Sequence, residues 1–336
     1  MELGSTARQA LGAVGVIAIA LAAMTIALGG PRELVGAFRG MPLAPLLASV
    51  SLLMLVEIVK AVRLCVLAGL GLGDMRACLI ARLLGRAAAN VTPAGIGGIP
   101  TRTAVLASEA RIEFGRAFGA ASGETLADNS VAIAALAAAA AAGLYNIVVL
   151  GIAGVIAAIW IGGIALSVGE GSSERLYRIL RVSASRRCAL ERERRAALSA
   201  LRLLLDPPRA AVVYLSTLAS HALEYMSVLV FAGGWWSPSA WLHALAAVEA
   251  GYMMVFTPAP GGGGGVEYAL ISFLGPRLAL YWRLSYLIAA LSPLILVYTA
   301  YTRFKRYVGE YGAPEECEEP PGSPGSPGPL QGGSAS

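Results

Sequence analysis

Charged side chains within otherwise apolar stretches are the first candidates for chemistry in this chain. Glu124 and Asp128 are four residues apart, so their carboxylates share one face of a helix. Arg86 lies in a second apolar stretch and Glu249 in a third. An ionisable group at the centre of a bilayer costs ~3 kcal/mol on insertion scales and usually has a function. We therefore assign Arg86 to substrate binding, and Glu124, Asp128 and Glu249 to proton or charge coupling. Internal ion pairs and snorkelling end residues are the alternatives.

Two further groups of embedded charges have a simpler explanation. Glu57, Lys60 and Arg63 form a row spaced by three residues, and His221 and Glu224 have the same spacing. Opposite charges at this spacing are neighbours on a helix surface and neutralise each other. We expect the row that starts at Glu57 to be a structural ion pair rather than a site.

A proline-glycine segment occurs twice in the chain. Residues 92–98 read TPAGIGG and residues 257–263 read TPAPGGG, which match at five of seven positions. Neither segment can continue a helix, because proline lacks an N–H and glycine has too much backbone freedom. Broken backbone is tolerated inside a bilayer only where it is buried in protein or lines a wet cavity. Paired helix breakers at membrane depth therefore indicate a transporter site.

The amides of these segments are suited to an anion. Unpaired N–H groups and the helix dipole both favour negative charge, and the amides of Gly95, Gly97 and Gly98 are expected to be free of helical bonding. The predicted substrate-binding residues are Arg86, Asn90, Thr92, Pro93, Gly97, Gly98, Arg102, Thr257, Pro258, Pro260, Gly261, Gly262 and Glu267.

Two of these residues hold equivalent places with opposite charge. Arg102 follows Thr92 by ten residues, and Glu267 follows Thr257 by ten. One hypothesis is that Arg102 and Glu267 pair across a pseudo-symmetry axis. The alternative is that both are interfacial residues facing water.

The elements that position these residues are predicted to be membrane helices. The chain has 336 residues, of which 57% are hydrophobic and 14% charged, whereas soluble domains have roughly a quarter of their residues charged. Stretches long enough to cross ~30 Å of hydrocarbon recur along it. The sequence predicts an all-α integral membrane protein with about six transmembrane helices, near residues 10–31, 44–68, 117–142, 146–168, 210–233 and 284–303.

Two re-entrant helical hairpins complete the predicted architecture. Residues 79–102 have arginines on both sides, so both ends are expected to face the cytoplasm, and residues 241–275 then enter from the opposite face. Helix, hairpin and helix would occur twice in opposite orientation, at about 42–142 and 210–304, as an inverted repeat. Residues 1–309 would form a single membrane domain. Ten plain crossings without a repeat are the alternative.

The distribution of charge predicts the orientation. Residues 169–209 hold ten arginines against five acidic residues, so the positive-inside rule places this loop in the cytoplasm. Both termini are then cytoplasmic. Leucine and alanine recur in the loop at helical spacing, which indicates an amphipathic helix near the anionic inner leaflet, with a solvated linker as the alternative. Residues 310–336 are acidic and then rich in Pro, Gly and Ser, which predicts disorder.

Several other kinds of site are not expected. Cys65, Cys78, Cys188 and Cys317 have neither metal-ligand nor redox spacing, so they predict no disulfide scaffold and no metal site. The glycine run at 261–265 is not followed by Gly-Lys-Ser/Thr, which excludes a nucleotide-binding loop. We expect no cofactor and no nucleic-acid partner.

A pocket lined by arginine and open amides suits a phosphate, because the guanidinium group matches phosphate oxygens in a bidentate way. The embedded acids suit proton coupling or an ammonium group on the cargo. A phosphate carried on an apolar tail, as in a lipid, explains why the site lies within the membrane.

The segment PGGGGGVE at 260–267, with Asn90-Val91-Thr92-Pro93 and Gly97-Gly98 upstream, resembles the lysylphosphatidylglycerol synthase transmembrane-region family of flippase-like proteins. The resemblance covers most of residues 10–305. It implies translocation of an anionic or aminoacylated phospholipid, or of a polyprenyl-phosphate-linked sugar, between leaflets. Gly263 and Gly265 stand where the family usually has apolar residues, which implies a looser hairpin. The soluble aminoacyltransferase domain of some relatives does not follow, so synthesis of the aminoacyl lipid is not expected from this chain.

Three functions are compatible with these patterns. The leading hypothesis is a multi-pass lipid flippase or scramblase of the cell membrane, not an enzyme, with membrane lipids as its partners. The alternative is a membrane-embedded transferase or phosphatase acting on a lipid phosphate, with Glu124 and Asp128 as metal ligands or base. The third is a scaffold whose loop at 169–209 recruits a soluble partner. A homo-oligomer is compatible with each of them.

Overall fold

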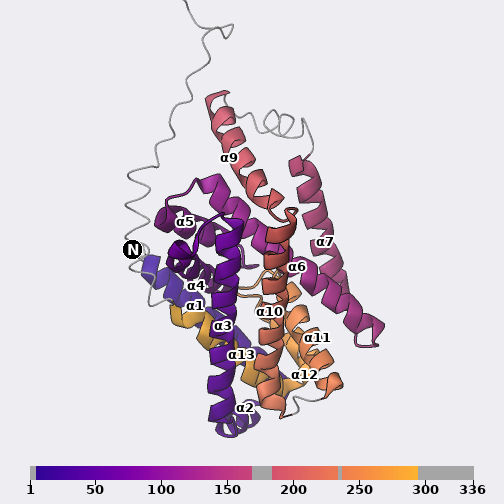
Figure 1. The fold of residues 1–336 in the computed structure, drawn as a ribbon. Helices are drawn as coiled ribbons and strands as arrows, with labels where there is room; N and C mark the ends of the chain where they lie inside the picture. Colours follow the sequence, from indigo (N-terminus) through magenta and orange to yellow (C-terminus); the bar gives the residue numbers. More distant parts are fainter. Residues whose placement is uncertain (1–4, 169–183, 234–236, 294–336) are drawn as a thin grey trace, which may run out of the picture.

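The computed structural model describes residues 5–168, 184–233 and 237–293, which form a bundle of helices (Figure 1). Within these ranges no β-strand is present, in agreement with the all-α prediction. The predicted disordered tail at 310–336 lies outside the described residues. The described helices are α1 (Ser5–Leu28), α2 (Pro31–Arg39), α3 (Leu43–Leu67), the 3₁₀ turn η1 (Leu72–Asp74), α4 (Met75–Val91), α5 (Gly98–Ala110), α6 (Phe114–Ala141), α7 (Ile147–Val168), α9 (Ala184–Arg202), α10 (Pro207–Ala232), α11 (Pro238–Met254), α12 (Gly265–Leu274) and α13 (Pro276–Leu291).

The same order of elements occurs twice along the chain. Helices α4 and α5 pack against each other as a helical hairpin, and α11 and α12 form a second one. The first hairpin stands between α3 and α6 in the sequence, and the second between α10 and α13. Helices α3 and α10 pack side by side along one face of the bundle (Figure 1).

Two apolar cores surround the hairpins. In the first half, Leu64 of α3 and Leu106 of α5 belong to one buried cluster. In the second, Leu229 of α10, Met253 of α11 and Leu270 of α12 belong to another. The first cluster also includes Val213 of α10 and the second Leu136 of α6, so neither core is confined to one half of the chain.

The chain turns sharply after α1. Gly29 and Gly30 have φ angles of 92° and 143°, which residues other than glycine rarely adopt. Pro31 then starts α2. Residues Ala18–Leu28 and Pro31–Arg39 differ in direction by 101°. Helix α1 packs against α4, α12 and α13, so it contacts both hairpins.

Most predicted long helices are present, but length and composition do not fix the number of crossings. Helices near 44–68, 117–142, 146–168 and 210–233 correspond to α3, α6, α7 and α10. Among the described helices, α10 is long and apolar enough to cross a membrane, and the bent pair of α1 and α2 would add a second span. The predicted crossing at 284–303 starts within α13 and continues outside the described residues.

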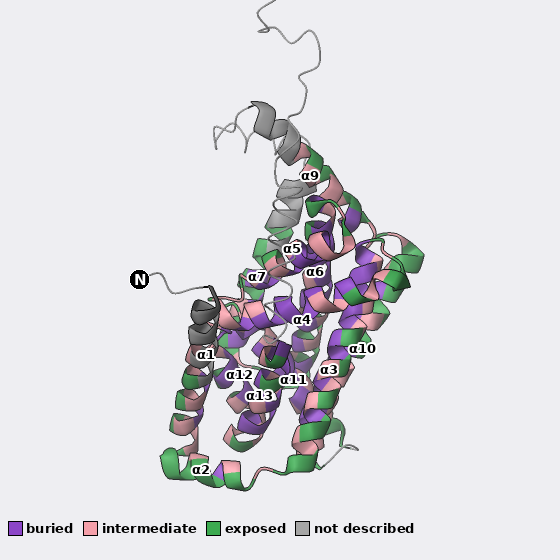
Figure 2. Cartoon of the chain, turned by 90° about the vertical axis from the view of Figure 1, so that its left-hand side faces the viewer, coloured by how far each residue is buried: buried purple, intermediate pink, exposed green. Residues whose placement is uncertain are grey.

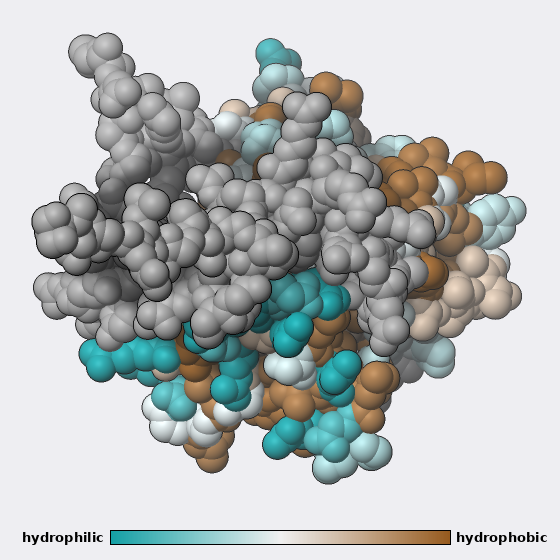
Figure 3. Space-filling view, turned by 90° about the horizontal axis from the view of Figure 1, so that it is seen from above, coloured by the Kyte–Doolittle hydropathy of each residue, from teal (hydrophilic) through white to brown (hydrophobic). Residues whose placement is uncertain are grey.

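Apolar side chains cover much of the outside of the bundle. Ile147, Val155 and Ile159 of α7, and Leu215 and Leu218 of α10, are more than half exposed. Figure 2 shows exposed and intermediate positions on the outer sides of the helices and buried ones toward the centre. Seen from above, hydrophobic side chains gather along one flank of the visible surface (Figure 3). Exposed apolar patches of this kind mark contacts with a membrane or with other proteins.

Gly263 and Gly265 are packed tightly, so the looseness expected from glycine at these two positions is wrong. A Cβ on Gly263 would lie 2.7 Å from Ile19 Cγ2 of α1, and one on Gly265 would lie 2.7 Å from Thr257 Cγ2. An apolar side chain at either position would collide with these neighbours. These glycines therefore allow close approach rather than motion.

The arginine-rich loop contains the expected helix, α9, which packs along α6. A Cβ on Gly115 would lie 2.3 Å from Glu193 O, and one on Gly119 would lie 2.4 Å from Ala197 O. The Glu193 carboxylate also accepts a hydrogen bond from the Gly115 amide. The glycines of α6 thus let α9 lie directly against its backbone.

A disulfide joins Cys65, near the end of α3, to Cys78 in the first turns of α4. The cysteine spacing predicted no disulfide scaffold, and for this pair the prediction is wrong. The two Cα atoms lie 5.8 Å apart, although the cysteines are 13 residues apart in sequence. The turn after α3 brings them together, and no motif spacing reports such a turn.

Candidate functional site

The two proline-glycine segments lie against each other. Pro93 and Pro260 form an isolated antiparallel β-bridge. The Ala94 amide donates to Ala259 O over 3.4 Å, and the Gly261 amide donates to Thr92 O over 3.3 Å. The interruptions of the two hairpins therefore form one continuous structure.

The glycine amides of this structure are not free, so the expected anion site built from open amides is wrong. Gly97 N donates to Thr92 Oγ1 over 2.9 Å, and Gly98 N donates to Gly95 O over 3.1 Å. The amides of Gly262 and Gly263 are likewise bonded within their own turn. Buried N–H groups are costly to leave unpaired, so the tight turns satisfy them locally. Recognition of an anion must then rely on side chains.

Charged side chains from both halves are buried around the breakers. In the described part of the chain, six cations and six carboxylates are at most 8% exposed, together with His221. Equal numbers of the two signs are expected, since a buried charge without a partner is strongly unfavourable. They are Lys60, Arg63, Arg82, Arg86, Arg102 and Arg283, and Glu57, Glu124, Asp128, Glu224, Glu249 and Glu267.

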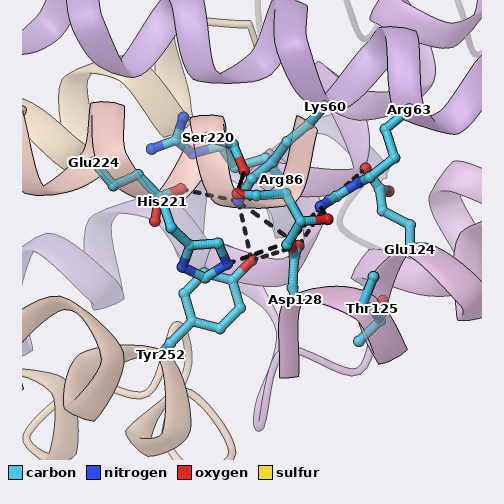
Figure 4. Close-up of polar contacts among 12 residues, drawn as sticks. Lys60, Arg63, Arg86, Glu124, Thr125, Asp128, Ser220, His221, Glu224 and Tyr252 are labelled. Atoms are coloured by element: carbon cyan, nitrogen blue, oxygen red, sulfur yellow. Dashed lines mark hydrogen bonds and ion pairs between the residues drawn. The ribbon is translucent and has the colours of Figure 1, made fainter. Parts of the chain in front are cut away.

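The two acids of α6 hold the centre of this network (Figure 4). Arg63 donates to Asp128 Oδ1 over 2.6 Å and to Glu124 Oε1 over 3.1 Å. Glu124 also accepts from Arg82 over 3.0 Å and from Arg102 over 2.5 Å. One carboxylate of the first half therefore neutralises three arginines.

The row that starts at Glu57 does not neutralise itself. Glu57 pairs with Arg82 and Arg86 of α4, whereas Lys60 donates to Glu224 of α10 over 2.9 Å. The expectation of a pair within the row is wrong, because tighter partners come from neighbouring helices. Its side chains link α3 to α4, α6 and α10 instead.

Arg102 and Glu267 do not pair with each other, and neither faces water. Arg102 donates hydrogen bonds to Glu124 and Thr125. Its side chain packs against Gly85, where a Cβ atom would lie 2.2 Å from it. Glu267 accepts from Arg283 Nε over 2.7 Å and from Gly264 N over 2.7 Å. Each residue is neutralised within its own half, so both earlier hypotheses for this pair are wrong.

Glu249 has a separate set of partners. One oxygen lies 2.5 Å from His221 Nδ1 and also accepts from the Tyr225 hydroxyl. The other oxygen, Glu249 Oε2, and His221 Nε2 are buried without a hydrogen bond within the described residues, although Nε2 lies 3.6 Å from Asp128.

A cavity of about 150 Å³ opens between the breakers and the charged residues. Its wall includes five cations, Lys60, Arg82, Arg86, Arg102 and Arg283, but only three carboxylates, Glu57, Asp128 and Glu224. Glu124 and Glu267, which neutralise three of these cations, are not part of the wall. The surface that a ligand would meet thus carries an excess of positive charge.

The structure divides the predicted site residues into two groups. Arg86, Asn90, Gly98, Arg102 and Asp128 line the cavity. The others do not line it. Most of them build the breakers or, like Glu124 and Glu267, pair with residues of the wall, whereas Glu249 pairs with His221 and Tyr225, which are not part of it. These residues are Thr92, Pro93, Gly97, Thr257, Pro258, Pro260, Gly261, Gly262, Glu267, Glu124 and Glu249.

Sequence reasoning missed several residues of the cavity wall. Arg283, Tyr252 and Tyr286 were not selected, and Lys60 and Glu224 were regarded as structural pairs. For Lys60 and Glu224, a charged side chain within an apolar stretch was the sequence signal that could have indicated a site. Nothing in the local sequence distinguishes the two tyrosines.

Asn129 follows Asp128 on α6 and also lines the cavity. It is 2% exposed, and both polar atoms of its side chain lack a hydrogen-bond partner within the described residues. A buried amide costs about 1–3 kcal/mol when it is left unpaired. An unpaired donor and an unpaired acceptor of α6 thus lie beside the cavity.

No group of three His, Cys, Asp or Glu side chains in the described ranges is arranged to hold a metal ion. Glu124 and Asp128, on which a metal-dependent transferase would rely, instead accept hydrogen bonds from arginines.

The fold and site define an all-helical protein whose ionic centre is buried beneath two broken hairpins. The family described as "Lysylphosphatidylglycerol synthase TM region" matches residues 14–299, and the chain belongs to this family. No curated protein and no solved structure matches the chain. The family is a transmembrane region of lipid-related proteins, so this chain is a membrane protein with a lipid-related function.

Proposed function

We propose that the protein moves a lipid with an anionic head group between the leaflets of the membrane. The cargo would be an anionic or aminoacylated phospholipid, or a polyprenyl-phosphate-linked lipid, with its phosphate in the cavity beside the two breakers. The single observation that carries this proposal is the contact between the two interruptions beside a cavity rich in buried cations.

The arrangement of the hairpins supports access from both sides. The helix, hairpin, helix order occurs twice, and the two breakers meet in antiparallel directions. An inverted repeat produces this relation, with one hairpin entering from each face and the site near the midplane. We propose six crossings with both termini cytoplasmic, repeats at about 42–142 and 210–304, and hairpins that alternately open the cavity to each leaflet.

The charges of the cavity favour a phosphate. Its wall has five cations against three carboxylates, and arginine binds phosphate oxygens through two parallel N–H groups. Asp128 and Glu224 lie in the same wall and would suit an ammonium group of an aminoacylated head group.

Coupling to protons would involve the acids. Glu124 and Asp128 are already held by arginines, whereas Glu249 shares its site with a histidine and a tyrosine and keeps one oxygen without a partner in the described structure. Among the three proposed coupling residues, Glu249 is the best placed to exchange a proton. Without coupling, movement would be downhill.

Part of the loop at 169–209, helix α9, packs against α6 of the membrane domain. Helix α9 covers the glycines of α6, the helix that carries Glu124 and Asp128. A soluble partner that binds this loop would thus act next to the site. We also propose that a homo-oligomer is compatible with the apolar outer faces of α7 and α10.

The experiment is leaflet exchange of fluorescent phosphatidylglycerol in vesicles that contain the purified protein. Arg86→Ala should slow exchange at least about tenfold, because a charge-assisted hydrogen bond contributes about 1.5–3 kcal/mol and each 1.4 kcal/mol is tenfold. Arg102→Ala should act in the same direction. The matched control is Arg195→Ala, which removes an arginine that is 77% exposed on α9 and should leave exchange unchanged.

Circular dichroism and size-exclusion chromatography must show that each variant is folded. Unchanged exchange in folded Arg86→Ala and Arg102→Ala proteins would remove the arginine-phosphate site from the proposal. A lipid-modifying activity of the purified protein, in place of exchange, would favour a membrane-embedded transferase or phosphatase.

A further inference from the structure

A second cavity, of about 310 Å³, lies between α1 and α13 and is almost wholly apolar. Ala20, Leu21 and Met24 of α1 and Phe38 of α2 form one wall. The other wall is the face of α13 that carries Leu280, Leu284, Leu287, Ile288 and Leu291. These positions recur at helical spacing, so one continuous stripe of α13 faces this groove.

The groove and the charged cavity meet at one residue. Arg283 lines both of them. On α13, Trp282 and Tyr286 line the charged cavity, while Leu284 and Leu287 line the groove. Helix α13 thus separates a polar space from an apolar one, and Arg283 lies at their border.

Two guanidinium groups from different halves converge beside this border. The Arg86 Cζ atom lies 4.4 Å from the ring centre of Tyr286, and the Arg283 Cζ atom lies 5.4 Å from it. Arg283 uses Nε for Glu267 and Nη2 for Gly261 O, and Nη1 makes no hydrogen bond within the described residues. A cation from each half is therefore close to the end of the apolar groove.

We infer that the groove between α1 and α13 holds an acyl chain of the lipid whose phosphate lies between Arg86 and Arg283. This inference rests on the proposed function for the nature of the cargo and adds the path of its tail. A polar space with excess positive charge that continues into an apolar groove is complementary to a phosphate joined to a hydrocarbon chain. The lipid would enter sideways between α1 and α13 with its chain still in apolar surroundings.

The test uses the full chain in phosphatidylcholine nanodiscs that contain phosphatidylglycerol with a diazirine in one acyl chain. After illumination, mass spectrometry should place the label on peptides of α1 and α13. Ile288→Trp fills the groove and should lower this labelling at least about tenfold. An acyl chain that buries two methylene groups fewer in the groove is expected to bind about tenfold more weakly. Ile288 is 41% exposed, so the larger side chain has room to fold. Leu291→Trp, at the end of the stripe, is the second variant.

The matched control is Ile159→Trp, which replaces an isoleucine that is 67% exposed on α7 and should not change labelling of α1 and α13. Glycerol 3-phosphate separates the two ends of the site. As a water-soluble competitor it should protect Arg283 from phenylglyoxal equally in the native protein and in Ile288→Trp, since it has no chain.

Two results would overturn the inference. Undiminished labelling in folded Ile288→Trp and Leu291→Trp proteins would show that the chain lies elsewhere. If Ile288→Trp loses glycerol 3-phosphate protection, the labelling of Leu291→Trp decides. Photocrosslinks from benzoylphenylalanine at position 288 to residues 294–336 in lipid-filled nanodiscs would assign the groove to this chain's own segment.

Leaflet exchange of the same lipid separates this inference from the proposed function. Normal exchange with undiminished labelling in the groove variants contradicts the groove alone. Labelled groove peptides in a native protein that does not exchange lipid contradict translocation and leave the binding site intact.

Discussion

The two broken hairpins use the same backbone interruption but carry opposite charges. The hairpin of α4 and α5 contributes Arg82, Arg86 and Arg102 to the buried centre, whereas that of α11 and α12 contributes Glu249 and Glu267. Both pack through glycines and pair with each other across their interruptions. The shared feature is thus the shape of the backbone, and the electrostatics differ completely.

The partners that neutralise the hairpins come from the helices around them. Glu57 of α3 and Glu124 of α6 serve the first hairpin, whereas Arg283 of α13 and His221 of α10 serve the second. A backbone break requires proline and glycine whatever its surroundings, but a buried charge requires only a partner. The two hairpins therefore share their breaks while their charges differ, and this asymmetry leaves the cations on the cavity wall.

Removing one carboxylate from each half is the strongest test of this asymmetry. Glu124→Gln leaves three buried arginines short of one negative charge, so we expect it to destabilise the protein by about 3–5 kcal/mol. Glu267→Gln affects one arginine and keeps an oxygen for the Gly264 amide, so we expect about 1–2 kcal/mol. Unfolding in a titration with sodium dodecyl sulfate, followed by circular dichroism, measures both. Equal losses would show that the halves are electrostatically equivalent.

Gly97 and Gly262, which align in the two breakers, differ in how closely their backbone is packed. Gly262 has φ +69°, and a Cβ there would lie 2.6 Å from Val255 Cα and 2.7 Å from Met254 O, so Gly262→Ala should cost about 3 kcal/mol or more. At Gly97, where φ is −71°, the obstructing atoms belong mainly to the Thr92 side chain, which can move. We expect Gly97→Ala to cost about half as much. A larger loss at Gly97 in the same titration would contradict this ranking.

The smallest expected effect on stability concerns Asn129. Replacing its unpaired amide in Asn129→Leu should leave the protein as stable or more stable by about 1 kcal/mol, while leaflet exchange falls because the cavity loses a donor and an acceptor. Asn146→Leu is the matched control. Asn146 accepts hydrogen bonds from the amides of Val148 and Val149 at the start of α7, so its loss should cost about 1 kcal/mol and leave exchange unchanged. The same response from both variants would contradict a ligand role for Asn129.

Much of the fold could be predicted because it depends on local sequence. The breakers at residues 92–98 and 257–263 were located from proline and glycine alone, since these residues act on their own backbone. The apolar stretches located α3, α6, α7 and α10 to within a few residues, and the family resemblance is confirmed over residues 14–299.

The partners of the buried charges could not be predicted in this way. The spacing of Glu57 and Lys60 favoured a pair within α3, but each side chain found a partner on another helix. Arg102 and Glu267 hold equivalent positions in sequence, yet each is neutralised in its own half. The disulfide between Cys65 and Cys78 depends on the turn between two helices and was missed for the same reason.

The places where helices form and break, and the side chains that carry charge, depend on a residue and its near neighbours, so they could be predicted from the chain alone. Packing brings the two breaks together, pairs the glycine amides, and places five cations on the wall of a cavity that Glu124 does not line. These features could not be predicted, because hydrogen bonds and ion pairs form between groups that packing brings within about 3 Å, whatever their distance in the sequence.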